Sequence, residues 1–469
     1  VKDVDIPEDT ASGKKRGKNR NLKTIREKVI DIAMDNPVCD ICGGKLVEIK
    51  PKITKRLVYV PSQLYVEKTV VHQYVCHECS EREETMYIFQ KEGYVEPRPL
   101  LKGSMASSSF VVASAYKKLA MGIPFYRQGK ELSRKGLSIS RQVICNWFVR
   151  CARQYLEPVF QRMEQDIRKS SILNMDETTL LCQERKNGRE SKSYEWLCMT
   201  NEYEKNQMAL YYYKKDRGQE NVNDILGDYC GVIQSDGYQA YSKFSSAEGH
   251  AGCLSHARRK FEDALKSNEA LYKQITRKGT AEEEKEKLLD ENPSFAKALW
   301  FVKQFDRIFK IEKKAKQAKH SFQEIEEIRQ TEEQPILEEM HEEAIQLINQ
   351  CAPSGKLYKA LNYMLNQWES LIYYLKDGRI PATNNIAERE GIKPFVMARK
   401  NFLFADTIEG AKATSMWFSL IISARMNHLD AEKYLIYVLD QLSASETITD
   451  ELVERCLPYS EQLPASLKM

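Results

Sequence analysis

The sequence predicts a multidomain α/β protein in which a metal-binding module and a helical region precede a mixed β-sheet, which a long helical insertion interrupts. Three observations support this class. Two Cys-x-x-Cys knuckles lie near the N-terminus, strand-like runs occupy residues 171–254, and a heavily charged helical stretch covers about residues 265–375. A chain of 469 residues is too long for one ordinary core, so two to four domains are expected.

Composition excludes several classes of protein. With 42% hydrophobic and 29% charged residues the chain reads as soluble, and no apolar run approaches the roughly 18 residues of a membrane span. It begins with Val and has no basic-then-apolar leader, so no signal peptide is expected. Twelve cysteines spread this widely indicate a reducing cytoplasm, and a net charge of +4 requires local basic patches for any nucleic-acid partner.

The first segment, residues 1–30, is polar and basic. From Lys14 to Lys28 it holds eight Lys or Arg against one Glu. Such a run is typical of a disordered, solvated tail, and it is equally typical of an arm that contacts phosphates. Both interpretations stay open.

Residues 31–100 are predicted to form a zinc ribbon. Its four thiolates close a tetrahedron around one structural Zn²⁺, and strand-like runs lie between the two knuckles. The proposed ligands are Cys39, Cys42, Cys76 and Cys79. His72 and His77 are weaker candidates, and four buried thiols without metal are the less favoured alternative.

Residues 101–168 are predicted to be helical. One helix follows Ser107, a second follows Pro124, and a third follows a turn at Gly136 with Ser140 as its cap. Short helices around a Gly-containing turn resemble a helix-turn-helix, whose second helix enters a major groove. A helical linker that packs on the next domain is an equal alternative.

Residues 169–264 are predicted to begin a ribonuclease-H-like core. Strands are expected at residues 172–176, 194–200, 208–213 and 231–236, with a helix near 220–226 and a fifth strand near 251–254. Three strands in series, then a helix and a further strand, are what such a sheet requires. Asp176 and Asp236 then lie at neighbouring strand ends if the first and fourth strands are adjacent.

Residues 265–380 are predicted to be an insertion with the solvated faces of an antiparallel helical hairpin. Residues 381–445 return to the core, and Thr383 or Asn384 is expected to cap a helix that carries Glu388. Lys393, Arg399 and Lys400 are expected on the following loop and strand. Helices are predicted near residues 411–426 and 431–442, and residues 446–469 form a tail.

Three carboxylates on two strands and a helix have a specific chemistry. Hard divalent cations take oxygen ligands, and two of them can activate a nucleophile and stabilise a leaving oxygen during attack on phosphorus. The sequence therefore predicts that Asp176, Asp236 and Glu388 hold two Mg²⁺ or Mn²⁺ ions in a phosphoryl-transfer site. Glu177 is expected to face away, because adjacent strand residues point to opposite faces.

Basic side chains near these carboxylates are predicted to contact the DNA backbone. The candidates are His256, Arg258, Arg259, Lys260, Arg389, Lys393, Arg399 and Lys400. His256 has a core or strand-end position as its alternative, and Arg389, Arg399 and Lys400 have simple surface charge as theirs. Tyr238 and Trp417 are expected in the core.

The chain resembles the IS66 group of transposases, which are DDE-class, retroviral-integrase-like enzymes. The matching stretches cover about residues 39–442: the paired knuckles, Met175-Asp-Glu-Thr178, Ser235-Asp-Gly-Tyr238, His256-Ala-Arg-Arg-Lys-Phe261, parts of 360–369, Asn384-Asn-Ile-Ala-Glu-Arg389 and Arg399-Lys-Asn-Phe-Leu-Phe404. The resemblance implies a DDE triad of Asp176, Asp236 and Glu388 that frees 3′-hydroxyls at the element's ends and joins them to target DNA. This sequence departs from the expected family pattern at Glu390, a carboxylate that competes with Glu388. The helical leader that the family pattern places before the zinc module is also not expected here.

The leading hypothesis is a bacterial, cytoplasmic and nucleoid-associated transposase acting on double-stranded DNA. The resemblance implies a homo-oligomer on DNA and accessory proteins from the same element, and no membrane partner is expected. Two alternatives remain: a zinc-ribbon DNA-binding regulator with an inactive core, and a nuclease or resolvase of the same fold that does not join strands.

Overall fold

The computed structural model describes residues 70, 74–75, 88–89, 98–183, 192–277 and 281–469. The chain divides into two compact units, Val1–Tyr94 and Val95–Met469. In the first unit the described strands β1 (Tyr74–Val75) and β2 (Ile88–Phe89) pair antiparallel. The predicted basic arm and the four knuckle cysteines lie outside the described residues.

The second unit begins with the three helices that the sequence predicts. They are α2 (Ser108–Leu119), α3 (Phe125–Arg134) and α4 (Arg141–Cys151). The Ser140 hydroxyl accepts a hydrogen bond from the Val143 amide at 3.3 Å, which confirms the predicted cap. A π-helical turn, η1 (Ala152–Leu156), continues α4 into α5 (Glu157–Ile167).

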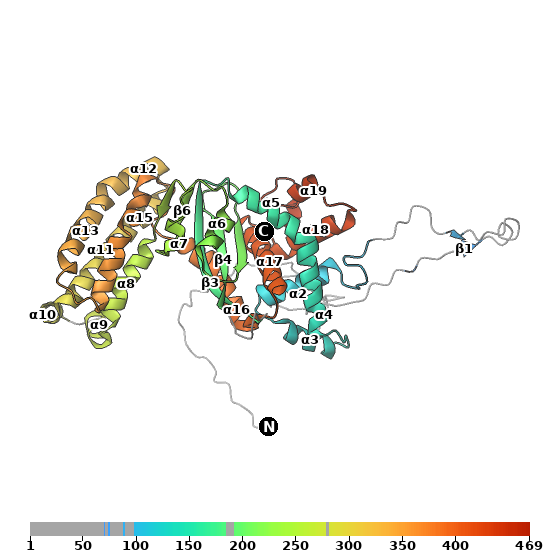
Figure 1. Cartoon of the computed structure of the whole chain (residues 1–469), viewed down its shortest axis with the longest axis horizontal. Coiled ribbons are helices and arrows are strands. Elements are labelled where there is room, and N and C mark those ends of the chain that lie inside the picture. The colour runs from blue at the N-terminus through green and yellow to red at the C-terminus, as the bar shows by residue number, and fades with distance from the viewer. Residues whose placement is uncertain (1–69, 71–73, 76–87, 90–97, 184–191, 278–280) are drawn as a thin grey trace, which may run out of the picture. The chain divides into compact units, whose positions relative to one another are not determined.

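A mixed sheet lies at the centre of this unit (Figure 1). Its main strands are β3 (Ile172–Cys182), β4 (Lys192–Thr200), β5 (Ala209–Lys214), β6 (Val232–Gln234) and β7 (Gly249–Ala251). Their order is β5-β4-β3-β6-β7, with β3, β4 and β5 antiparallel and with β6 and β7 parallel to β3. Two short helices, α6 (Gln219–Leu226) and α7 (Gln239–Ser242), follow β5 and β6.

Several strand boundaries differ from the predicted ones. β4 begins at Lys192 rather than at residue 194, and β6 ends at Gln234, so Asp236 lies beyond the strand on which it was predicted. β3 continues six residues beyond Asp176, because β4 pairs with it as far as Leu181 and β8 (Phe404–Ala405) pairs with its end. The fifth strand ends at Ala251 rather than near residue 254, where α8 (Leu254–Lys266) already begins.

Side-chain alternation on the strands separates the two faces of the sheet. Tyr211 of β5 stacks on Phe395 of α16 (Lys393–Phe402) and contacts Phe418 of α17 (Ile408–Met426). The next residue, Tyr212, packs against Phe160 of α5 on the other face. The chain then closes with α18 (Ala431–Ala444), α19 (Asp450–Arg455) and a short 3₁₀ turn, η5 (Ala465–Leu467).

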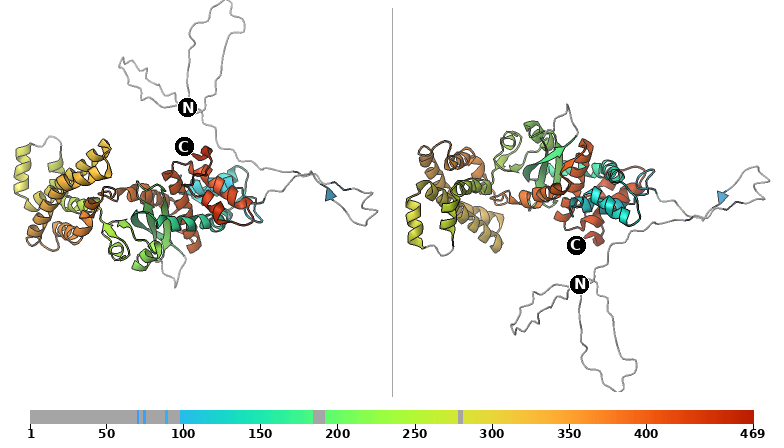
Figure 2. Two further views of the ribbon diagram at one scale, coloured as in Figure 1. Left: turned by 90° about the horizontal axis from the view of Figure 1, so that it is seen from above. Right: turned by 90° about the horizontal axis from the view of Figure 1, so that it is seen from below.

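A helical block follows β7 in the sequence and lies to one side of the sheet (Figures 1 and 2). After α8 it contains α9 (Glu269–Thr276), α10 (Glu282–Asp290), α11 (Pro293–Ala318), α12 (Phe322–Ile328), η2 (Arg329–Glu333), α13 (Gln334–Ile348), α14 (Lys356–Asn366), α15 (Trp368–Ile372) and η3 (Tyr373–Lys376). The predicted single hairpin is therefore wrong. A left-handed residue at Lys319 and a capping box at Ser321 break the chain into more helices, which share a core around Phe261 and Phe301, stacked at 4.4 Å.

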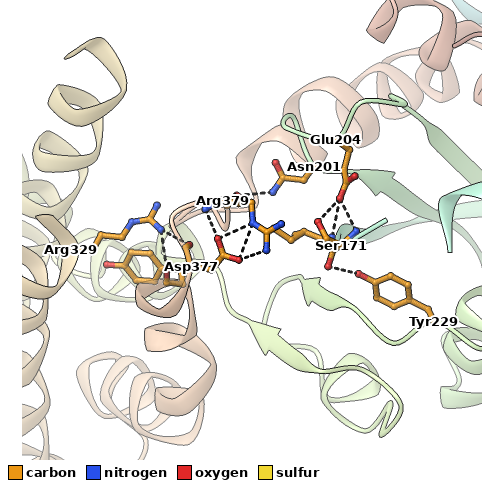
Figure 3. A network of polar contacts seen from close by, with 9 residues as sticks. Ser171, Asn201, Glu204, Tyr229, Arg329, Asp377 and Arg379 are labelled. Atoms are coloured by element: carbon orange, nitrogen blue, oxygen red, sulfur yellow. Dashed lines mark hydrogen bonds and ion pairs between the residues drawn. The ribbon is translucent and has the colours of Figure 1, made fainter. Parts of the chain in front are cut away.

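Polar contacts anchor the return of this block to the sheet (Figure 3). Arg329 is 2% exposed and donates at 2.9 Å to the carbonyl oxygens of Tyr374 and Asp377. Asp377 in turn holds the Arg379 guanidinium, and the Asn201 side chain donates to the Arg379 carbonyl at 3.0 Å. The segment that leads to residue 384 is thus fixed to the end of β4. Across the described residues, no helix is long and apolar enough to cross a membrane.

Candidate active site

Asp176 and Asp236 lie on adjacent parallel strands, as the sequence predicts for those strands. The register pairs Asn174 of β3 with Gln234 of β6, and each aspartate comes two residues later. Asp236 follows the end of its strand, and its carboxylate accepts a hydrogen bond from the Tyr238 amide at 2.9 Å. Both aspartates therefore lie at the same edge of the sheet.

Glu388 comes from η4 (Ala387–Ile392), a π-helical turn that continues into α16. This turn lies close against the sheet, because a Cβ atom at Gly391 would meet the Leu197 side chain at 2.2 Å. The Tyr211 hydroxyl also donates to the Gly391 carbonyl at 2.7 Å. Leu197 pairs with Asp176 across β3 and β4, so Glu388 is carried on the face of the sheet to which Asp176 points.

A buried network of amide side chains joins the three segments. The Asn174 side-chain amide donates at 2.8 Å both to Gln234 Oε1 and to Asn384 Oδ1. The Asn384 amide donates to the Met175 carbonyl at 2.9 Å, and all three amide residues are at most 1% exposed. Asn384 is therefore a brace between strands, and the prediction that its side chain caps the helix is wrong.

The Asp176 carboxyl resists ionisation. Burial, together with the charges of Glu177, Asp236 and Glu388, raises the pKa of Asp176 to about 8. Only the hydrogen bond from the Glu177 amide, at 2.8 Å, acts in the other direction. The charges of Asp236 and Glu388 therefore act on Asp176, although burial is the largest cause of its raised pKa.

Helix α8 supplies the partners of Glu388. His256 Nε2 lies 3.0 Å from Glu388 Oε1, and the Arg259 guanidinium lies 3.4 Å from Oε2. Burial lowers the pKa of His256, while the charges of Glu388 and Asp236 raise it. His256 is thus beside the third carboxylate rather than in the core.

Glu177 points to the opposite face from Asp176, as alternation predicts, but it has close partners there. Its side chain is 3% exposed, forms an ion pair with Arg217 and accepts a hydrogen bond from the Tyr241 hydroxyl. Burial raises the pKa of Glu177, and the charge of Asp236 raises it too. The sequence analysis did not single out Arg217, whose guanidinium lies 3.8 Å from the ring centre of Tyr238. The sequence feature that could have indicated Arg217 is its position between β5 and α6.

The other predicted DNA-binding residues are divided among several positions. Arg258 forms ion pairs with Glu262 and with Asp306 of α11, so it ties α8 to the helical block. Lys260 lies over the Tyr363 ring at 5.3 Å, and Arg389 pairs with Glu390 on the surface. Glu388, and not Glu390, is the carboxylate that faces His256.

Three cations expected on a loop and a strand lie on α16 instead. Lys393 and Lys400 are exposed, while Arg399 donates to the hydroxyls of Thr178 and Thr179 at 3.2 and 2.9 Å. The helix extends through Phe402 because η4 and α16 form one continuous element. Trp417 is fully buried as predicted, whereas Tyr238 is only half-buried.

The donor set suits hard divalent cations, since Asp176, Asp236 and Glu388 offer only carboxylate oxygens. A bound cation would also offset the burial and the neighbouring charges that raise the pKa of Asp176. In the part of the chain that the structure describes, no three His, Cys, Asp or Glu side chains are already grouped closely enough to hold one ion.

Comparison with known families decides the family. A model described as the IS66 family of transposases matches residues 103–413, well over half of the chain. The chain belongs to the IS66 transposase family. A second model, the zinc-finger binding domain of the IS66 transposase, matches residues 36–80, which include all four knuckle cysteines.

Two similar proteins come from Sinorhizobium fredii (strain NBRC 101917 / NGR234). The uncharacterized protein y4hP is 27% identical over 414 residues, which cover 86% of this IS66-family chain and 70% of y4hP. The uncharacterized protein y4jD is 26% identical over 441 residues, which cover 92% of this chain and 79% of y4jD.

Proposed function

We propose that this IS66-family chain is an insertion-sequence transposase that cleaves DNA strands and joins them with a DDE triad of Asp176, Asp236 and Glu388. The observation that carries the proposal is geometric: Asp176 and Asp236 lie at the same ends of adjacent parallel strands, and η4, which carries Glu388, packs on Leu197, the residue that pairs with Asp176. The sheet order β5-β4-β3-β6-β7, with three antiparallel strands followed by two parallel ones, supports a ribonuclease-H-like core.

The triad residues would hold two Mg²⁺ or Mn²⁺ ions. When bound, the ions would activate water or a 3′-hydroxyl and stabilise the departing oxygen on phosphorus. His256 and Arg259 orient the Glu388 carboxylate from α8. The amide network around Asn174 holds the backbone of all three ligand segments.

Exposed cations around the triad are suited to the DNA backbone. Arg259, Lys260, Lys393 and Lys400 are exposed and come from α8 and α16, the helices that flank Glu388. Phosphate contacts supply most of the affinity of DNA-binding proteins, so these side chains would hold the duplex across the carboxylates. The zinc module adds a second DNA-binding part, consistent with the family match at residues 36–80.

The test is cleavage and strand transfer on a labelled duplex that carries the element's end, with Mg²⁺ or Mn²⁺. Asp236→Asn and Glu388→Gln are expected to lose cleavage and joining by at least about 100-fold, while DNA binding is retained. Glu390→Gln is the matched control, since its carboxylate pairs with Arg389 on the surface, and it should stay active.

Each other result has a definite meaning. Full cleavage by Asp236→Asn would rule out the triad. Loss of activity in Glu390→Gln but not in Glu388→Gln would move the third ligand to Glu390. Cleaved ends without joined products would identify a nuclease or resolvase, and binding without any cleavage by the wild type would identify a regulator.

A further inference from the structure

The helices that precede the core are strongly cationic. Residues 98–156 contain eleven Lys or Arg and a single acidic residue, Glu131, which gives a net charge of +10, although the whole chain carries only +4. Glu131 is itself neutralised, since Lys117 and Lys135 lie 3.3 and 3.0 Å from its carboxylate. Positive charge concentrated in this way attracts a polyanion.

Helix α4 has one fixed face and one free face. Its buried face includes Phe148, which stacks on Trp417 of α17 with ring centres 5.4 Å apart. The Trp417 indole also donates to the Phe148 carbonyl at 3.1 Å. One face of α4 therefore packs on the C-terminal helices, as the linker interpretation expects, and this packing holds the opposite face rigidly toward solvent.

The free face carries side chains that recognise bases. Gln142, Asn146 and Arg150 are exposed and recur every four residues, so they form one row along the helix. Gln and Asn pair with adenine edges and Arg pairs with guanine in the major groove, while Val143 beside them offers a methyl contact for thymine. The row has few ties to the protein: Gln142 bonds to Asn146 at 3.2 Å, and Arg150 donates to the Lys102 carbonyl at 3.3 Å.

The surface along this row is hollowed and flanked by cations. An open hollow of about 460 Å³ is lined by Val143, Asn146, Trp147, Val149 and Arg150. On the preceding helix α3, Arg127, Lys130 and Arg134 are exposed.

We infer that α4 is a recognition helix that enters the major groove of a B-form DNA duplex and reads its bases through Gln142, Asn146 and Arg150. The α3 cations contact the flanking phosphates. A second copy of this chain is the weaker occupant, because two faces with a net charge of +10 repel each other. The inference rests on the proposed function, which supplies DNA as the substrate. It adds the helix through which the protein recognises the base sequence. Figure 2 shows α2–α4 on the other side of the sheet from α9–α13.

The experiment selects duplexes from a random-sequence pool with the full-length protein and then measures affinity for the selected duplex and for a scrambled one. Gln142→Ala with Asn146→Ala is expected to reduce the ratio of the two affinities by about 10-fold or more, with nearly unchanged affinity for the scrambled duplex. Gln346→Ala with Asn349→Ala is the matched control, since both residues are exposed at the end of α13. Arg127→Gln with Arg134→Gln should instead weaken binding to both duplexes and reduce the salt slope by about 2.

Two results would overturn the inference. In the first, the α4 double variant selects the same DNA sequence with the same affinity ratio as the wild type. That result would assign base recognition to another part of the chain. The other is a change in oligomeric state, without a change in DNA preference, when these residues are replaced. Asn146→Arg distinguishes a loss of recognition from simple unfolding. If α4 recognises bases, this variant should prefer a different base at one position rather than lose all sequence preference. Cleavage of the selected duplex by the wild type and not by Glu388→Gln tests the proposed function separately.

Discussion

Asn384 contacts both β3 and the loop after β7 from a single position. Its side chain bonds to Asn174 and to the Met175 carbonyl, and its backbone amide donates to the Cys253 sulfur at 3.1 Å. Asn384 precedes Glu388 by one helical turn, while Asn174 and Gln234 precede the aspartates by two residues each. The carboxylates are therefore held through neighbours whose side-chain amides bond to one another inside the protein.

Replacing Asn384 with Ala is expected to destabilise the protein by about 1–3 kcal/mol, because the Met175 carbonyl and one Asn174 bond lose their partner inside the core. Urea unfolding would measure the change. Asn385→Ala is the control, because Asn385 is exposed and should change stability by less than about 0.5 kcal/mol. Equal unfolding midpoints for the two variants would contradict the bracing role.

For individual residues, the sequence predicted that the two aspartates lie on adjacent strands, but it did not predict which side chains lie next to them. Asp176 and Asp236 follow β-branched or apolar runs whose period is visible in one dimension. The choice between Glu388 and Glu390 depends on which side of a π-helical turn meets α8, and that is decided by the close approach of Gly391 to Leu197. The bracing role of Asn384 depends on contacts across 210 residues, so local capping chemistry gave the wrong interpretation.

Strand β4 carries a buried carboxyl group between the sheet and helix α17. Glu195 is fully buried, and Ser415 of α17 lies beside it. Burial raises the pKa of Glu195 from 4.5 to about 8. The element therefore packs with this side chain protonated at neutral pH, and deprotonation would place a charge in the sheet-helix interface.

The pH dependence of stability should reveal this group. Between pH 4.5 and 8 the unfolded carboxyl loses a proton that the folded one keeps, so Glu195 makes stability fall as pH rises through that window. Glu195→Gln cannot ionise, and it should gain on the order of a few kcal/mol relative to wild type between pH 5 and pH 8. Thermal unfolding at pH 5, 6.5 and 8 would test this, with exposed Glu283→Gln as control. A variant whose melting temperature follows the wild type at every pH would refute it.

Elements were predicted best where periodicity was strong and local. The strands of the sheet and the helices α2, α3 and α4 fall at their predicted positions because alternation, caps and turns mark them. The helical block was simplified to one hairpin, since mixed charges hide where its helices end. The end of β3 was missed because only pairing with β4 and β8 extends it.

The described part of the molecule has two hydrophobic cores. One joins α2–α5, most of the sheet and α17–α19, and the other joins α8 and the helices after it to Ile172, Val232 and Ala251 on the sheet. Helix α8 belongs to both the block and the candidate site, because Arg258 pairs with α11 while His256 and Arg259 hold Glu388. A shift of the block relative to the sheet would therefore move the partners of the third carboxylate.

The zinc module gives a prediction for the whole chain. Metal analysis of the purified protein should find about one tightly bound Zn per chain. Cys39→Ser with Cys76→Ser should remove it, whereas Cys230→Ser should not, because Cys230 is an exposed free thiol in the sheet unit. Retention of the metal in the double variant would show that other residues bind it.

The hydrogen bond between Asn174 and Asn384 also has a consequence during synthesis. A ribosome adds roughly 5–20 residues per second, so the 210 residues that separate these two positions take roughly 10–40 s to emerge. Toward the end of that time the nascent chain carries both aspartates and helix α8 but not Glu388. A chain interrupted there would consequently leave the ribosome without the third carboxylate of the proposed triad.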